Sequence, residues 1–216
     1  MKLAYLVIAL ALFVPSRLMA DEAPSRQLHY AGDTRIGSTT SPMTIDLDIG
    51  AVRPDYTTPI EIDEHVRGVD LGVHDLVLDK SGVIPDEAQT LTFEEETILD
   101  MLALQFENAT GLGVGDEWDR AGEMMGGTHE THYRVRQVAN LVVDMDVTRT
   151  IDFANGNTGT WSGMMRYNAD TVVPMAVLLN GDFVNNRDQS HHALALSARL
   201  VSDSFAQQQQ QQQQQP

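Results

Sequence analysis

Two short histidine clusters are the segments of this chain whose residue types could bind a metal. The first is His129-Glu130-Thr131-His132, and the second is the pair His191-His192. Helical zinc sites of hydrolases place two histidines four residues apart, whereas the spacing here is three. On a strand, residues three apart point to opposite faces of the sheet. A metal site built from His129, His132 and His192 therefore requires separate strands to converge, and it would imply a metal-dependent hydrolase.

Other motifs with a possible chemical role are incomplete. Asp46 and Asp48 resemble the start of a calcium loop, but Gly50 is one position early and the twelfth position is Thr57. The glycine-rich run 111–115 follows an expected helix instead of opening one, which argues against a phosphate cradle. We therefore expect no cofactor beyond a weakly bound divalent cation, held by the acidic half of the chain. A non-enzymatic function is favoured.

The composition excludes several classes of protein. The chain of 216 residues has a formal charge of −17 and contains no cysteine. The absence of cysteine removes disulfides, thiolate zinc sites and iron–sulfur clusters. Nucleic-acid binding depends on clustered lysine and arginine, so a chain this acidic is not expected to bind nucleic acid.

The N-terminus has the pattern of a secretory signal peptide. Lys2 precedes an apolar run over 3–14, and a small residue, Ala20, precedes the acidic start of the next segment. Twelve apolar residues span only about 18 Å as a helix, too short for a bilayer core of about 30 Å. We expect cleavage after residue 20, no transmembrane span in the mature chain, and a location in the periplasm, at the cell surface or outside the cell. Cleavage would remove two of the fourteen basic residues, Lys2 and Arg17.

The rest of the chain divides by composition. Residues 21–42 are polar and predict a flexible leader, residues 43–206 a single β-rich domain, and residues 207–216 a disordered polyglutamine tail. Of the acidic residues, 24 lie in 21–130 and seven in 131–206. The domain therefore combines an acidic half, 43–130, with a nearly neutral β half, 131–206.

The periodicity predicts a mainly β fold with one or two helices, as an antiparallel sheet or a sandwich-like domain. Apolar residues alternate around 45–49, 60–62, 69–73 and 76–78, which is typical of half-buried strands. Thr92 and Glu95 form a capping box ahead of a helix expected over 93–108. A second, shorter helix is expected over 117–125. Alternation over 133–147 predicts one long strand, and further strands are expected at 158–167 and 171–179.

The strand at 172–179 is apolar on both faces, so both faces must be covered by the core or by a partner. Candidate interaction residues are therefore Val172, Val173, Met175, Val177 and Leu179. Trp161 and Tyr167 share one face of a strand and could form a sugar platform or part of the core.

These features favour an exported, non-enzymatic protein of the cell surface, extracellular matrix or a fibre. It would associate with itself or with another exported protein. The alternatives are the metal-dependent hydrolase and an acidic module that binds calcium or glycans.

Overall fold

The computed structural model describes residues 25–78, 91–107, 111–124, 127–169, 171 and 173–207. The expected signal peptide at 1–20, Val172 and nearly all of the polyglutamine tail lie outside these ranges. Among the described residues, no helix has the length and apolar character needed to cross a membrane.

Ten strands and one long helix make up the described chain, and the fold is mainly β as predicted. In chain order they are β1 (Arg26–Ile36), β2 (Thr39–Ile49), β3 (Thr58–Val66), β4 (Val69–Leu78), α1 (Phe93–Glu107), β5 (Glu117–Met124), β6 (Gly127–Ala139), β7 (Val142–Phe153), β8 (Thr158–Asn168), β9 (Val173–Val184) and β10 (His191–Asp203).

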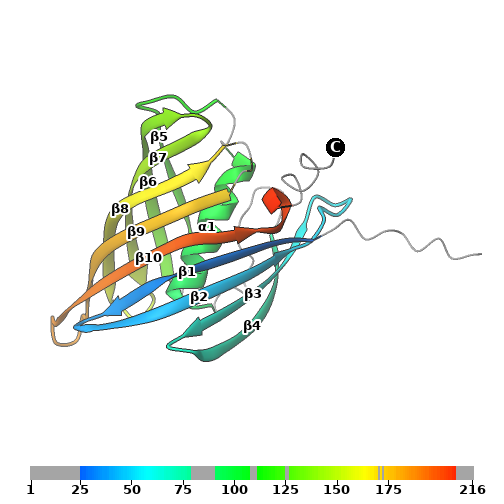
Figure 1. Ribbon diagram of the computed structural model, residues 1–216. Helices are drawn as coiled ribbons and strands as arrows, with labels where there is room; N and C mark the ends of the chain where they lie inside the picture. Colours follow the sequence, from blue (N-terminus) through cyan, green and yellow to red (C-terminus); the bar gives the residue numbers. More distant parts are fainter. Residues whose placement is uncertain are drawn as a thin grey trace, which may run out of the picture.

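All ten strands form one antiparallel sheet with the order β4-β3-β2-β1-β10-β9-β8-β7-β6-β5 (Figure 1). Strands that follow one another in the chain are neighbours in the sheet, except for β4 and β5, and the first strand, β1, also pairs with the last, β10. This central pairing joins the first and last strands, for example Thr34 opposite Leu196. The two open edges of the sheet are therefore β4 and β5, which flank α1 in the sequence.

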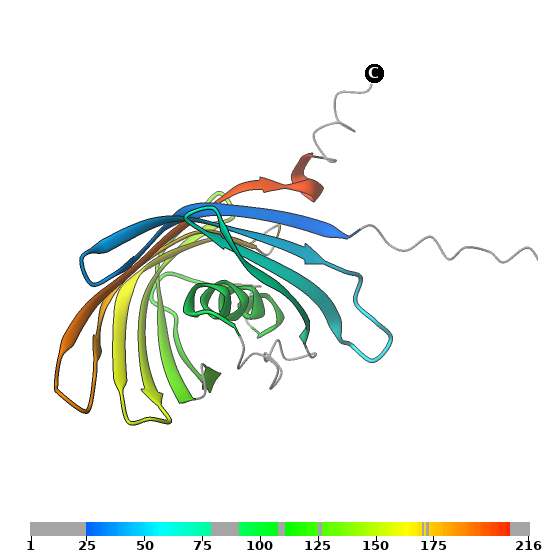
Figure 2. The ribbon, with the colours of Figure 1, turned by 90° about the horizontal axis from the view of Figure 1, so that it is seen from below.

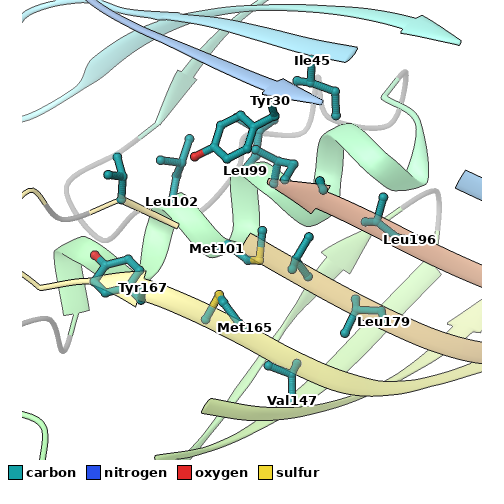
Figure 3. Close-up of a cluster of buried hydrophobic side chains, with 14 of the residues drawn as sticks. Tyr30, Ile45, Leu99, Met101, Leu102, Val147, Met165, Tyr167, Leu179 and Leu196 are labelled. Atoms are coloured by element: carbon teal, nitrogen blue, oxygen red, sulfur yellow. The ribbon is translucent and has the colours of Figure 1, made fainter. Parts of the chain in front are cut away.

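The sheet curves around α1, so the helix occupies the place that a second sheet would take in a sandwich (Figure 2). Side chains from the concave face of the sheet pack against the helix, as the cluster around Leu99, Met101 and Leu102 shows (Figure 3). Every residue from Glu94 to Leu102 is buried. Because α1 is enclosed on all sides in these turns, its polar side chains need partners inside the protein.

The helix begins where the capping box predicted. The Thr92 hydroxyl accepts a hydrogen bond from the Glu95 backbone N–H at 3.1 Å, and the Glu95 carboxylate accepts one from the Thr92 N–H at 2.9 Å. These two bonds satisfy backbone donors that the first turn of a helix leaves without partners. The predicted span of 93–108 is thus confirmed to within one residue.

Two polar segments were assigned wrongly from the sequence. Most of the expected leader, 21–42, is ordered, because β1 begins at Arg26 and β2 at Thr39. The expected helix over 117–125 is strand β5, which pairs with β6 along its whole length. Both segments have few large apolar residues, so the period of their side chains is weak. Their pairing partners determine the structure instead.

The single long strand expected over 133–147 is a hairpin. Asn140 and Leu141 both have positive φ, 50° and 66°, and connect β6 to β7. In the pairing of Tyr133 with Val147, odd-numbered residues face odd-numbered residues. Next to the two-residue turn the pairing is odd with even, as in Ala139 opposite Val142, and the register shift between Val135 and Gln137 changes it to odd with odd. This bulge restores the alternation of inner and outer positions, so the sequence pattern continues on the far side of the turn.

A buried charge cluster joins the middle of α1 to strands β5–β7. The Asp100 carboxylate contacts Arg149 of β7, pairs with Arg120 of β5 at 3.0 Å, and accepts a hydrogen bond from Tyr133 of β6 at 3.0 Å. Arg149 is 1% exposed and also donates to Thr131 at 2.9 Å. Burial disfavours the charged carboxylate, but the two arginines outweigh this effect and hold the pKa of Asp100 below its ordinary value.

We predict that Arg149→Met lowers the free energy of unfolding by about 3 kcal/mol, because it leaves the buried Asp100 carboxylate with incomplete compensation. Denaturant unfolding measures the loss. Arg166→Met is the matched control, since Arg166 pairs with Asp144 on the exposed face and should lose less than about 1 kcal/mol. Equal losses for the two variants would contradict the role given to the buried cluster.

Candidate functional site: an apolar pocket at the start of the helix

A pocket of about 620 Å³ lies between the first turn of α1 and the concave face of the sheet. Its position is at the ends of β1 and β7, near the starts of β8 and β10. This volume falls within the range typical of small-molecule sites, about 300–1,000 Å³. Its walls are almost entirely apolar, and the main side chains are Ile36, Phe93, Phe153, Trp161, Phe183 and Leu194.

Aromatic rings form most of the pocket wall. Phe93 stacks on Trp161 with 4.8 Å between ring centroids, and Phe153 meets Phe183 edge to face at 5.5 Å. Two glycines give the Trp161 ring its room. A Cβ at Gly159 would lie 2.1 Å from Trp161 Cη2, and one at Gly181 would lie 2.8 Å from Trp161 Cδ1. The indole therefore lies directly against the backbone of β8 and β9.

The pocket has polar groups at one side. Glu94 accepts a hydrogen bond from Thr34, and both residues line the pocket. Thr92 also lines it, and its hydroxyl donates to Glu64 Oε2 at 2.5 Å. The rim is open to solvent, where Ile36 is 64% exposed. The pocket is thus an apolar chamber with carboxylates near one wall.

Glu64 is the most perturbed of these carboxylates. Its side chain is fully buried on the concave face, and Oε1 accepts no hydrogen bond from a described residue. Burial raises the pKa of Glu64 from 4.5 to about 7. The Thr92 hydrogen bond opposes this rise, and the nearby charges of Glu94 and Glu95 add to it. Burial likewise raises the pKa of Glu95, against the opposing effect of its hydrogen bonds and of His74.

The structure does not bring the predicted metal-binding histidines together. His129 points to the concave face and is buried near Asp100, whereas His132 points outward and pairs with Asp119 at 2.7 Å. Burial lowers the pKa of His129, and the charges of Arg149 and Arg120 act in the same direction, whereas the nearby Asp100 carboxylate opposes this by raising it. His192 lies at the pocket rim, where its ring is 6.3 Å from the Phe183 ring.

A serine also lies beside His192, but the arrangement is not that of an activated nucleophile. Ser190 Oγ is 3.2 Å from His192 Nε2, and it donates its own proton to Asp188 at 2.7 Å. In a catalytic triad the acid orients the histidine, and the histidine accepts the serine proton. The contacts at this rim are those of a polar turn between β9 and β10.

The predicted interaction residues lie in the middle of the sheet. β9 is paired on both sides, with β8 and with β10, so it is not an edge. Val177 and Leu179 are buried on the concave face, Val173 is also buried, and Met175 is half-buried. Trp161 and Tyr167 are each 1% exposed on the same face. They do share one face, as their spacing predicted, but that face packs within the core.

The comparisons with known proteins suggest no family: the chain matches no protein-family model, no curated protein and no solved structure.

Of the residues that line the pocket, only Trp161 and His192 were predicted from the sequence as site residues, and both for other roles. The other aromatic residues come from the start of α1, the end of β7 and the end of β9, so their sequence positions are unrelated. The only local signal is the pair of glycines, Gly159 and Gly181, which stand where an apolar side chain would continue the pattern of the concave face. Such a gap becomes meaningful only when the register between β8 and β9 is known.

We predict that Glu64→Gln removes part of the pH dependence of stability. The pKa of Glu64 is higher in the folded chain than the 4.5 of the unfolded chain. The contribution of Glu64 to the free energy of unfolding is therefore present below pH 4.5 and is lost as pH rises through about 7. Glu64→Gln should match the parent at pH 5 and be more stable by about 2 kcal/mol at pH 8. Denaturant unfolding at both pH values measures this difference.

The control for this experiment is Glu61→Gln, an exposed position on the opposite face of β3. The difference in stability between Glu61→Gln and the parent should be the same at both pH values. A Glu64→Gln variant that loses stability equally at pH 5 and pH 8 would contradict the assignment.

Proposed function

We propose that the protein is an exported binding protein that holds a small apolar molecule in the pocket at the start of α1. The observation that carries this proposal is the chamber of about 620 Å³ whose walls are aromatic and aliphatic and whose rim opens to solvent. Burying the apolar surface of a ligand there would contribute about 25 cal/mol for each Å² removed from water.

The construction of the walls supports binding by shape. Trp161 is fixed between Phe93 and the backbone of two glycines, so its ring is held in place before a ligand arrives. A preformed wall loses little side-chain entropy on binding. Export, proposed from the N-terminal sequence, fits a carrier of a molecule that is poorly soluble in water.

Binding of the uncharged fluorescent probe N-phenyl-1-naphthylamine tests this proposal. Leu194→Trp fills the pocket and should weaken probe binding by at least about tenfold. Leu178→Trp is the matched control, because Leu178 is exposed on the opposite face of the sheet and should leave the affinity within about twofold.

A second readout locates the probe. The chain has two tryptophans, Trp118 and Trp161, so Trp118→Phe leaves a single tryptophan in the pocket wall. Energy transfer from Trp161 to the bound probe is expected in this variant. The proposal fails if the probe does not bind, or if Leu194→Trp and Leu178→Trp bind it equally.

The edge of the sheet at β4 supports a second candidate, self-assembly as part of a surface layer or fibre. No described strand pairs with the outer edge of β4, and Val69, Leu71 and Val73 are 59%, 45% and 52% exposed on it. An open edge with exposed apolar side chains can add a strand from a second copy. The sequence placed such contacts at 172–179, whereas the open edge favours β4.

Sedimentation velocity over a range of protein concentrations tests assembly. We expect the parent chain to form concentration-dependent oligomers and Leu71→Lys to reduce them. Leu178→Lys is the control, since Leu178 is also 45% exposed but lies in the centre of the sheet. A parent chain that stays monomeric, or equal effects of the two substitutions, would rule out assembly through this edge.

A further inference from the structure

The turn between β3 and β4 brings together three side chains with metal-binding atoms. Asp63, His65 and Asp70 each offer one such atom, and these atoms all lie within 4.8 Å of one another. They are the one group of this kind among the described residues. The group is far in sequence from His129, His132 and His192, and it was not recognised from the sequence.

The hairpin explains why these three residues meet. Arg67 and Gly68 form the turn, with φ of 56° and 72°, and place His65 directly opposite Asp70. Asp63 and His65 are two residues apart on β3, so both point to the outer face while Glu64 between them points inward. The register shift between Asp63 and His65 lies at the same place. Such irregularities commonly redirect a side chain beside a functional site.

The distances suit a small divalent ion. Asp63 Oδ1 and His65 Nδ1 are 3.4 Å apart. Two ligand atoms of a tetrahedral zinc ion with bonds of about 2.0 Å lie about 3.3 Å apart. Asp63 Oδ1 is buried and accepts no hydrogen bond from a described residue, so its lone pairs are available. Asp70 Oδ1 accepts the Gly72 N–H at 2.7 Å, which orients this carboxylate within its own turn.

The surrounding charges favour a cation. On the outer face Asp46 lies directly opposite Asp63, Asp48 opposite Glu61, and Glu61 opposite Asp75. Like charges in directly opposed positions of a sheet repel one another. A bound divalent ion would reduce the repulsion at Asp63, and the negative field of this face would raise the local concentration of cations.

We propose that Asp63, His65 and Asp70 bind one first-row divalent metal ion, with zinc as the best match. One imidazole and two carboxylates, without sulfur, suit zinc better than calcium, which prefers oxygen ligands alone and in larger number. Three protein ligands leave at least one coordination position for water or for a group from a partner. The site is on the outer face of the sheet, so it is separate from the pocket and does not depend on its function.

Isothermal titration of the untagged mature chain with ZnCl₂, after removal of metal by a chelator, tests this proposal. We expect one zinc ion per chain and a higher melting temperature in its presence, because an ion that binds only the folded state stabilises it. His65→Gln and Asp70→Asn should each weaken zinc binding by at least about tenfold. Both positions are near the surface, and a melting curve without metal verifies that each variant folds.

His132→Gln is the matched control, since His132 is also an outward histidine that contacts an aspartate on a neighbouring strand. It should leave the zinc affinity unchanged. The proposal is wrong if zinc does not bind, if His65→Gln and His132→Gln have equal effects, or if calcium binds at the site and zinc does not.

Discussion

The contact of Asp100 with Arg149 is the interaction on which the arrangement of the interior depends. A helix that is surrounded by a curved sheet cannot turn a polar side toward water, yet α1 carries several acidic residues in its first turns. The sheet supplies Arg149 and Arg120 as partners for the middle of the helix, and the Thr34 hydroxyl donates a hydrogen bond to Glu94 at its start. These partners fix the rotation of α1, and this rotation turns Phe93 toward Trp161 and so defines the pocket wall.

The buried carboxylates in the middle of α1 and near its start have different electrostatic surroundings. Around Asp100 the positive charges are sufficient, and the pKa of the carboxyl group is lowered. Around Glu64 and Glu95 burial dominates, and the pKa values are raised. The charged form is therefore favoured at Asp100 and disfavoured at Glu64 and Glu95.

The sequence predicted the elements that depend on short-range patterns, such as a capping box or the alternation of apolar and polar residues. The capping box of Thr92 and Glu95 gave the start of α1, and strict alternation gave the inner faces of β2, β3 and β7. The turn at Asn140 was not predicted, because the register shift between Val135 and Gln137 restores that alternation beyond the loop. The pocket and the group at Asp63, His65 and Asp70 depend on strand register, which one sequence does not contain. The histidine clusters are close in sequence, but residues one or three apart on a strand point to opposite faces of the sheet.

The pairing of β1 with β10 also has a consequence for the order of folding. Leu28 lies opposite Asp203, and Arg26 forms a 2.6 Å ion pair with Asp203, so contacts in the centre of the sheet join the two ends of the described chain. Native contacts of such long sequence separation slow folding, because the loop must close before they form. During synthesis, hairpins β1–β2 and β3–β4 would be made early, but β1 could pair with β10 only after the last strand had been made. The protein can become compact only after nearly the whole chain is available, a property that would suit the export proposed above.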